Sequence, residues 1–320
     1  MSNLLEIKNL KKYFATPRGE LHAVDNVNLN IEKGKTIGVV GESGCGKSTL
    51  GKTLMRLHTP TSGEVLYNGV DIASMPMKEF KKNYRTNIQM IFQDPYASLD
   101  PRMNVLQLIE EPIKVNHKDM SKADVTARAK EMMELVGLAK RLEGSYPHEL
   151  DGGRRQRIGI ARALSLNPDF IVCDEPVSAL DVSIQAQILN LLQNLQAERG
   201  LTYMFITHDM SVVKHISDDI AVMYLGQLIE KCPANEIFKN TIHPYSQALL
   251  SAIPIPNVHV KKERMILKGE LTSPIDPKPC CRFAARCPYA TDECMAKEPE
   301  LREVKPNHFV ACHYAEKFMK

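Results

Sequence analysis

The chain has 320 residues, of which 43% are hydrophobic and 25% are charged, and its formal net charge is +3. This composition is that of an ordinary globular protein, and the length allows one large core and a smaller module. The small net charge gives no reason to expect a nucleic-acid partner. The longest apolar runs, such as residues 170–173 and 220–225, are far shorter than the about 20 residues of a membrane-spanning helix. The N-terminus lacks a signal-peptide pattern, so we expect a cytosolic protein, soluble or membrane-peripheral.

The first 35 residues are expected to form strands, because Val27, Leu29 and Ile31 alternate with asparagines. An apolar strand over residues 36–40 then leads into a glycine-rich loop and a predicted helix. The loop reads Gly-x-x-x-x-Gly-Lys-Ser and comprises Gly41, Glu42, Ser43, Gly44, Cys45, Gly46, Lys47, Ser48 and Thr49.

This order of strand, glycine-rich loop and helix is typical of a phosphate-binding loop. Backbone N–H groups surround the phosphates of a nucleotide, Lys47 contacts the terminal phosphates, and the Ser48 hydroxyl ligates Mg²⁺. The alternative is a glycine-rich turn without a ligand, which the flanking strand and helix disfavour. The loop therefore predicts binding of ATP or GTP.

Strand and helix patterns alternate after the loop. Strands are predicted over residues 63–66 and 88–92, with a helix over 77–84 between them. From about residue 94 to 167 the pattern is helical only, with Ser121 as the cap of a helix over 123–136.

A strand over residues 170–173, a helix over 182–199 and a strand over 203–206 restore the alternation. We predict an α/β fold in which residues 94–167 form a helical insert. Pro, Lys and Cys become frequent from residue 257 onward, so the predicted domains are residues 1–256 and a Cys-rich C-terminal module, residues 257–320.

Two carboxylates end the apolar strand near residue 170. Asp174 is suited to hold Mg²⁺ through water, and Glu175 to polarise an attacking water. A glycine-rich helix start follows the sequence Leu150-Asp151, and it is a further anion site when taken alone. Together with the phosphate loop, the carboxylates indicate a nucleotide hydrolase.

The full set of motifs resembles the ATP-binding-cassette (ABC) family over residues 4–230. After the phosphate loop come, in the family's order, Gln93, a signature segment, the two carboxylates, Asp181 and His208. The signature segment consists of Asp151, Gly152, Gly153 and Arg154. The resemblance implies a P-loop fold with a mixed sheet core, an antiparallel β edge and a helical insert, and it implies hydrolysis of ATP with Mg²⁺.

The resemblance also implies residue roles. Phe14 takes the place of the aromatic residue that stacks on adenine, with Tyr13 as the alternative. Gln93 contacts Mg²⁺ and reports its presence to a membrane partner. His208 hydrogen-bonds the γ-phosphate and positions Glu175 and water. Asp174 and Ser48 are expected to complete the Mg²⁺ ligands. Asp181 is expected to lie in the loop that couples the two subunits of a dimer.

The signature departs from the family pattern Leu-Ser-Gly-Gly-Gln, since Asp151 replaces the Ser and Arg154 replaces the Gln. In the family this segment contacts ATP that is bound to the partner subunit. A carboxylate donates no hydrogen bond and repels a phosphate. We therefore expect a heterodimer with a sister ABC ATPase that has an intact signature. The alternative is that Asp151 is tolerated and both sites hydrolyse ATP normally.

Three segments outside the catalytic set, residues 93–103, 146–150 and 243–250, resemble bacterial dipeptide and oligopeptide importer ATPases. Nickel importers share much of this pattern. The resemblance implies two membrane-spanning permease subunits, whose short helices dock near Gln93, an extracytoplasmic substrate-binding protein, and a place at the cytoplasmic face of the bacterial membrane. A soluble cassette ATPase acting on DNA or ribosomes and a metal-centred regulatory module are the remaining alternatives.

Five of the eight cysteines lie in residues 280–312. In a reducing compartment this clustering favours a metal site over disulfides. Cys281, Cys287, Cys294 and Cys312 suit Zn²⁺ or an iron–sulfur cluster. Short Cys-x-x-Cys knuckles are missing, and the tail resembles importer tails that carry a [4Fe-4S] cluster, so the cluster is favoured. The remaining candidates are Cys280 and His313, which are spare ligands, and Cys45, Cys173 and Cys232, which are expected in the core or in loops.

Overall fold

The computed structural model describes residues 2–253, 265–267, 269 and 273–319. The chain divides into two units. Unit 1 consists of Met1–Ser74 and Phe205–Lys320, and unit 2 consists of Met75–Met204. The predicted domain boundary between residues 256 and 257 lies outside the described residues.

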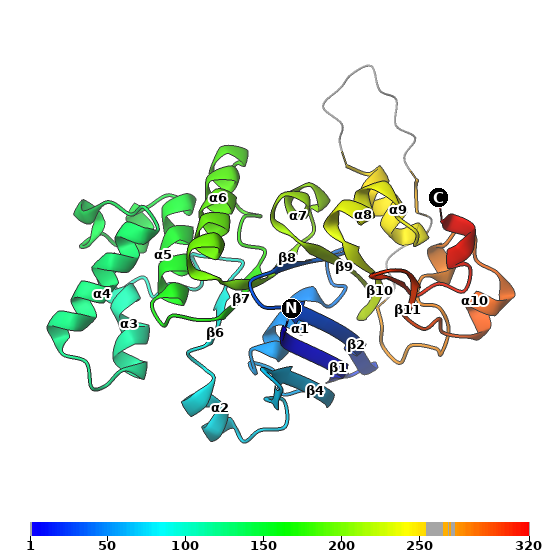
Figure 1. The fold of residues 1–320 in the computed structure, drawn as a ribbon, viewed down its shortest axis with the longest axis horizontal. Coiled ribbons are helices and arrows are strands. Elements are labelled where there is room, and N and C mark those ends of the chain that lie inside the picture. The colour runs from blue at the N-terminus through cyan, green and yellow to red at the C-terminus, as the bar shows by residue number, and fades with distance from the viewer. Residues whose placement is uncertain (1, 254–264, 268, 270–272, 320) are drawn as a thin grey trace, which may run out of the picture. The chain divides into compact units, whose positions relative to one another are not determined.

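Unit 1 contains an antiparallel sheet of four strands in the order β2-β1-β4-β5. Its strands are β1 (Asn3–Thr16), β2 (Gly19–Glu32), β4 (Ser62–Tyr67) and β5 (Val70–Asp71). Strands β1, β2 and β4 are labelled in the lower part of Figure 1. In β2 the side chains of Val27, Leu29 and Ile31 are buried while the asparagines between them are exposed. The predicted N-terminal strands and their two-residue period are thus confirmed.

The second sheet of unit 1 mixes parallel and antiparallel pairs. Strand β3 (Thr36–Val40) pairs parallel with β9 (Asp219–Tyr224), and β9 pairs antiparallel with β10 (Gln227–Pro233). Two strands from the C-terminal module, β12 (His308–Val310) and β11 (Arg302–Lys305), continue this sheet from β10. The Cys-rich segment is therefore joined to the core of unit 1 by backbone hydrogen bonds.

Short helices complete unit 1. They are α1 (Lys47–Leu54), α7 (Met210–Ile216), α8 (Ala234–Lys239), α9 (Pro244–Ser251) and α10 (Asp292–Ala296), with 3₁₀ turns η3 (Ala284–Arg286) and η4 (Ala315–Phe318). Strand β8 (Thr202–Thr207) contains the change from unit 2 to unit 1.

Unit 2 combines a parallel strand pair with helices. Strand β6 (Ile88–Ile91) pairs parallel with β7 (Phe170–Asp174). The helices are α2 (Met77–Asn83), α3 (Val105–Asn116), α4 (Lys122–Leu135), α5 (Gly152–Leu164) and α6 (Val182–Arg199), with 3₁₀ turns η1 (Lys140–Leu142) and η2 (Pro147–Glu149).

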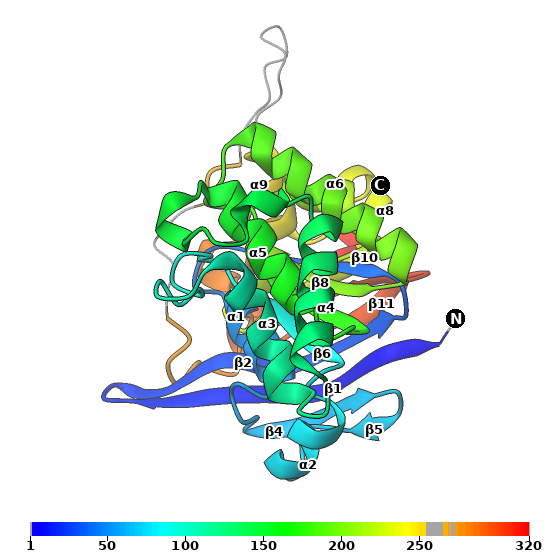
Figure 2. The same ribbon diagram turned by 90° about the vertical axis from the view of Figure 1, so that its left-hand side faces the viewer.

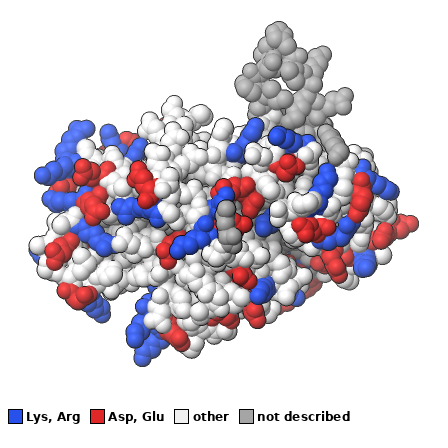
Figure 3. Space-filling view, viewed as in Figure 1, with Lys and Arg blue, Asp and Glu red and all other residues white. Residues whose placement is uncertain are grey.

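The helical insert consists of α3, α4 and α5, which Figure 2 shows side by side. Ser121 caps α4 by accepting a hydrogen bond from the backbone N–H of Asp124 at 3.2 Å, so its predicted role is confirmed. Asn104 and Gln107 form a capping box at the start of α3. Basic and acidic side chains are interspersed on the face of this insert seen in Figure 3.

The predicted α/β fold with a mixed sheet, an antiparallel β edge and a helical insert is confirmed. Most element ends agree with the predictions to within one residue, and the helix of residues 182–199 agrees at both ends. Of the helices that the structure describes, none is both long enough and apolar enough to cross a membrane.

Candidate nucleotide-binding and hydrolysis site

The glycine-rich loop follows β3 and ends in α1, as predicted. Two of its glycines are required by close backbone approach. Gly41 has φ 155°, and a Cβ there would lie 2.3 Å from the carbonyl oxygen of Met223. Gly46 has φ 106°, and a Cβ there would lie 2.1 Å from the carbonyl oxygen of Ala23. A side chain at either position displaces the loop from the neighbouring backbone.

Lys47 occupies the centre of the loop. Its side chain is almost fully buried, and Nζ donates hydrogen bonds to the carbonyl oxygens of Gly41 at 2.8 Å and Glu42 at 3.0 Å. Gly46 offers no side chain to cap α1, so the positive end of the helix dipole faces the same loop. A buried ammonium group beside an uncapped helix N-terminus fits a phosphate group.

The two aromatic candidates for adenine stacking differ in their contacts. Tyr13 stacks on His22 with ring centroids 3.8 Å apart, and its hydroxyl donates to Asp25. Burial raises the pKa of the Tyr13 hydroxyl, and the hydrogen bond to Asp25 raises it further. Among the ring contacts of the described residues, Phe14 has two: its ring and that of His58 meet edge to face, and the ammonium group of Lys12 lies over it. These contacts favour Phe14 over Tyr13 for a ligand ring.

The carboxylates lie at the end of β7. Asp174 is buried as the last residue of the strand, and Glu175 follows it with φ 46°. A left-handed backbone is costly for a residue other than glycine and is often found at functional sites. Gln93 Nε2 donates a hydrogen bond to Glu175 Oε2 at 3.2 Å. Unit 2 therefore brings together two of the residues predicted to act on the nucleotide.

The altered signature residues have a structural role at the start of α5. Asp151 caps the helix by accepting a hydrogen bond from the backbone N–H of Arg154 at 2.8 Å. The Arg154 side chain also forms an ion pair with Asp151 at 3.3 Å, and both side chains are largely exposed. The two departures from the family pattern thus compensate each other's charge.

The signature glycines pack against the segment that contains Asp181. A Cβ on Gly152 would lie 3.0 Å from Leu180, and one on Gly153 would lie 2.6 Å from Ile184. Asp181 itself caps α6 by accepting a hydrogen bond from the backbone N–H of Ile184 at 3.0 Å. The start of α5 and the loop before α6 therefore form one packed surface.

His208 directly follows β8 and is exposed. The next residue, Asp209, caps α7 by accepting a hydrogen bond from the backbone N–H of Ser211 at 2.7 Å. The structure places the phosphate loop, Phe14 and His208 in unit 1. Unit 2 holds Gln93, Asp174, Glu175, the signature residues and Asp181.

Two contacts of the phosphate loop were not predicted from the sequence. The Tyr245 hydroxyl accepts a hydrogen bond from the backbone N–H of Glu42 at 2.8 Å, and Arg286 pairs with the Glu42 carboxylate. These partners are separated from Glu42 by 203 and 244 positions, so no local pattern signals them.

The four predicted ligand cysteines line one small enclosed cavity of about 20 Å³, together with Phe283, His313 and other residues of the module. Burial raises the pKa of Cys281 to about 12 and also raises the pKa values of Cys287 and Cys312. Within the described residues, no group of three or more His, Cys, Asp or Glu side chains is arranged to hold a metal ion. The described residues therefore contain no preformed metal site that supports the prediction. Cys45, Cys173 and Cys232 are buried in unit 1 or unit 2, as expected.

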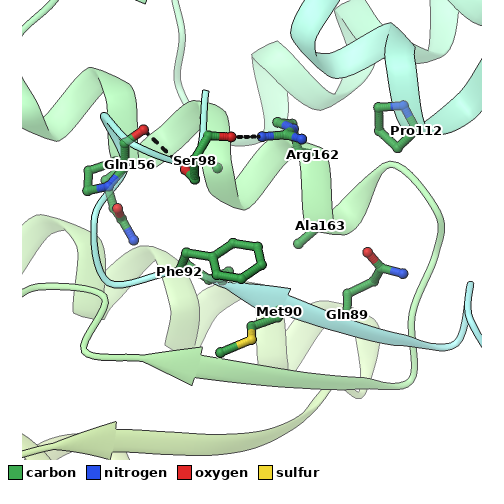
Figure 4. A pocket seen from close by; sticks show the side chains of 11 residues that line it. Gln89, Met90, Phe92, Ser98, Pro112, Gln156, Arg162 and Ala163 are labelled. Carbon is green, nitrogen blue, oxygen red and sulfur yellow. Dashed lines mark hydrogen bonds between the residues drawn. The ribbon is translucent and has the colours of Figure 1, made fainter. Parts of the chain in front are cut away.

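Unit 2 contains a cavity of about 100 Å³ between β6, the segment after it, α3 and α5 (Figure 4). Phe92, which precedes Gln93, points into it, and more than a third of its surface is exposed. Arg162 donates a hydrogen bond to the carbonyl oxygen of Ser98 at 2.7 Å across the cavity wall. Burial lowers the pKa of this guanidinium.

The loop, the carboxylates and the fold define a P-loop nucleotide hydrolase. A family model described as ABC transporter matches residues 24–178. A second model, described as the C-terminal region of oligopeptide/dipeptide transporters, matches residues 229–294. The chain belongs to the ABC transporter ATP-binding family and is an ATPase that binds ATP with Mg²⁺.

Two curated relatives from Bacillus subtilis (strain 168) match almost the whole chain. The oligopeptide transport ATP-binding protein AppF is 50% identical over 319 residues, covering 97% of each chain. The oligopeptide transport ATP-binding protein OppF is 49% identical over 313 residues, covering 98% of this chain and 97% of the relative. Among solved structures, a dimeric ATP-binding cassette bound to ADP and Pi is 32% identical with a TM-score of 0.66, and the alignment covers 72% of this chain and 98% of that one.

Proposed function

We propose that this chain is the energy-coupling ATPase of a binding-protein-dependent importer for dipeptides or oligopeptides. The observation that carries the proposal is the similarity to two oligopeptide transport ATP-binding proteins at about half identity over almost the full length. The match of residues 229–294 to an oligopeptide/dipeptide transporter region supports the same substrate class. A nickel importer is the second candidate, since its ATPases share much of the motif pattern.

Hydrolysis is assigned to the residues that match the family's motifs. The phosphate loop, with Lys47 and Ser48, binds the phosphates, and Phe14 stacks on the adenine. Asp174, Gln93 and Ser48 would hold Mg²⁺, which neutralises charge on the phosphate oxygens. Glu175 accepts a proton from the attacking water. His208 hydrogen-bonds the γ-phosphate and positions Glu175 and that water. The buried carboxylate of Asp174 and the hydrogen bond between Gln93 and Glu175 support these roles.

The chain pairs with a different ATPase, and its own signature serves the partner's site poorly. Asp151 offers a carboxylate where the family has a hydroxyl donor, and its negative charge repels that of the γ-phosphate. The ion pair with Arg154 offsets part of that charge. Asp181, packed beside the signature through Ile184, is assigned to dimer coupling.

Two membrane-spanning permease subunits dock on unit 2, which places the chain at the cytoplasmic face of the membrane. The cavity lined by Phe92, Ser98 and Gln156 supports this site, because an exposed aromatic ring beside a concave surface suits the side chains of a short helix. Phe92 is adjacent to Gln93, so the docking site and the catalytic carboxylate are linked within one unit.

The C-terminal module, residues 257–320, is proposed to carry a [4Fe-4S] cluster on Cys281, Cys287, Cys294 and Cys312. The support is the donor set: four soft thiol groups line one enclosed cavity. Burial raises the pKa values of Cys281, Cys287 and Cys312, so these three thiols must release protons when they bind the cluster. Iron, acid-labile sulfide and zinc assays on anaerobically purified protein test this assignment. Colourless protein with stoichiometric zinc contradicts it.

The composition of the assembled complex tests the proposed function. A tagged copy of the chain is extracted from its native membrane, and the intact mass and subunits of the complex are measured. One sister ATPase with an unaltered signature and two permease subunits support the proposal. A soluble homodimer contradicts the asymmetric importer.

A further inference from the structure

The 3₁₀ turn η3 of the C-terminal module reaches the phosphate loop. Arg286, the last residue of η3, holds both carboxylate oxygens of Glu42: Nη1 lies 2.7 Å from Oε2, and Nη2 lies 3.1 Å from Oε1. Glu42 directly follows Gly41 in the loop. Bidentate pairing of a guanidinium with a carboxylate fixes direction as well as distance. The two side chains are only 11% and 29% exposed, so solvent screens this pair less than an ordinary surface pair.

The same loop residue is fixed on its backbone side. The Glu42 N–H donates to the hydroxyl of Tyr245, and the edge of the Tyr245 ring packs against Tyr224 with centroids 4.7 Å apart. The Tyr224 hydroxyl lies 3.5 Å from Nη1 of Arg286. Glu42 is thus held by Tyr245 and by Arg286 of the C-terminal module, and Tyr224 contacts both of these residues.

Phe283 anchors the segment that carries Arg286. Its ring is buried and contacts Tyr224 and Tyr245 at centroid distances of 5.3 and 5.5 Å. Cys281 and Cys287 lie at the two ends of this segment, and the backbone N–H of Cys287 donates to the Phe283 carbonyl at 2.9 Å. The segment therefore lines the cysteine cavity and also contacts the phosphate loop.

A second arginine of the segment reaches the strands beside the loop. Arg282 is almost fully buried and pairs with Asp25 of β2 and with the carbonyl oxygen of Leu225. Asp25 also accepts the hydrogen bond from Tyr13, the neighbour of Phe14. The turn after Leu225 is tied to the loop because the N–H of Gly226 donates to the Cys45 carbonyl at 2.8 Å.

We propose that Arg286 is a positioning residue for ATP binding, and that the segment Cys281–Cys287 forms part of the nucleotide site. Arg286 holds Glu42, and through it the phosphate loop, in the shape that receives phosphates. Binding to an ordered loop costs less conformational entropy than binding to a loop that must first be ordered. Loss of the pair therefore weakens ATP binding without removing any group that acts on the water.

The test compares five variants of the full chain. Arg286→Met keeps the length of the side chain and removes its charge and donors, and Glu42→Gln removes the charge on the other side. The double variant reports whether the two residues act as one pair. Arg302→Met is the matched control, because Arg302 forms an exposed ion pair with Glu316 in the same module.

We expect Arg286→Met and Glu42→Gln each to raise the Kd for ATP about tenfold, and the double variant to show no further increase. Arg302→Met should leave the Kd for ATP unchanged. Arg286→Lys has a single ammonium group in place of the two-pronged guanidinium, so its Kd should lie between those of the wild type and Arg286→Met. In the assembled transporter, Arg286→Met should raise KM for ATP and leave kcat within about twofold.

A purely structural role gives a different result. Arg286→Met would then lower Tm while its Kd for ATP stays equal to that of Arg302→Met, and this contradicts the proposal. If Arg286→Met does not fold, Glu42→Gln tests the same ion pair by changing its phosphate-loop member. An unchanged Kd for ATP in that variant overturns the proposal.

Discussion

Gln93 donates a hydrogen bond to the carboxylate of Glu175, with 3.2 Å between Nε2 and Oε2. The two residues are 82 positions apart and follow the adjacent parallel strands β6 and β7. Phe92, next to Gln93, lines the cavity that we assign to the permease subunits. A shift of this loop on docking therefore changes the surroundings of the proposed catalytic carboxylate directly.

Replacing Gln93 should uncouple hydrolysis from transport. We expect Gln93→Ala to bind ATP with an affinity within about threefold of the wild-type value, because the phosphate loop is untouched. Stimulation of ATPase activity by a substrate-loaded binding protein should be lost. Steady-state ATPase rates of the reconstituted complex, with and without loaded binding protein, measure this. Asn194→Ala, at an exposed position of α6, is the control and should keep full stimulation.

Glu175→Gln should abolish turnover and preserve ATP binding. The amide keeps the shape of the side chain and can still contact Gln93, but it cannot accept a proton from water. The loss of a general base lowers kcat about 10² to 10⁴-fold. Phosphate release and ATP binding are measured on the same preparation, with Glu198→Gln on α6 as the control. A Glu175→Gln protein that hydrolyses ATP at the wild-type rate would show that another group is the base.

Restoring the signature should raise turnover at the partner's site. We expect the double change Asp151→Ser and Arg154→Gln to increase the ATPase rate of the assembled heterodimer when this chain's own site is silenced by Glu175→Gln. Serine also caps helices, so α5 should remain intact. Asp151→Asn separates charge from capping, since it keeps the acceptor oxygen and removes the charge. No increase with either variant means that Asp151 is tolerated.

The buried His243 should make the fold sensitive to acid. Its burial lowers its pKa from 6.5 to about 4, so the unfolded chain binds more protons than the folded chain between these values. Stability therefore falls as pH decreases through this window. From pH 7.5 to pH 5 the loss from this group is about 2 kcal/mol, by the relation of 1.36 kcal/mol per pKa unit.

Urea unfolding at several pH values measures this effect. His243 packs beside Glu230, which accepts hydrogen bonds from the backbone of Ile242 and His243 and also pairs with His308 at 2.8 Å. His243→Asn keeps a side-chain acceptor for the N–H of Tyr245. The variant should be less stable at pH 7.5 but should lose less stability between pH 6.5 and 5. An unchanged pH slope would assign the acid sensitivity to other groups.

The sequence predicts those parts of the site that depend on local pattern. A loop between a buried strand and a helix needs glycine at Gly41 and Gly46 because neighbouring backbone leaves no room for a Cβ, and this requirement is visible in the motif. Caps such as Ser121 are visible for the same reason, since they act within one helical turn.

Contacts between distant segments were not predictable from the sequence. The C-terminal strands β11 and β12 extend the sheet from β10, and Arg286 reaches Glu42 across 244 positions of the sequence. The sequence motif indicates that Asp151 either weakens the partner's site or is tolerated, and it gives no sign of the helix cap that Asp151 forms at the start of α5. Capping and phosphate contact use the same side chain, so the sequence alone does not separate the two roles.

We propose that this ATPase powers peptide import. The most direct measurement is uptake of a radiolabelled tripeptide and of ⁶³Ni²⁺ into proteoliposomes that contain the complete complex, with ATP on the side of this chain and the binding protein on the other. We expect ATP-dependent peptide uptake that Glu175→Gln abolishes or strongly reduces, without Ni²⁺ uptake. Nickel uptake without peptide uptake, or no ATP-dependent uptake of either solute by an ATP-hydrolysing complex, would contradict it.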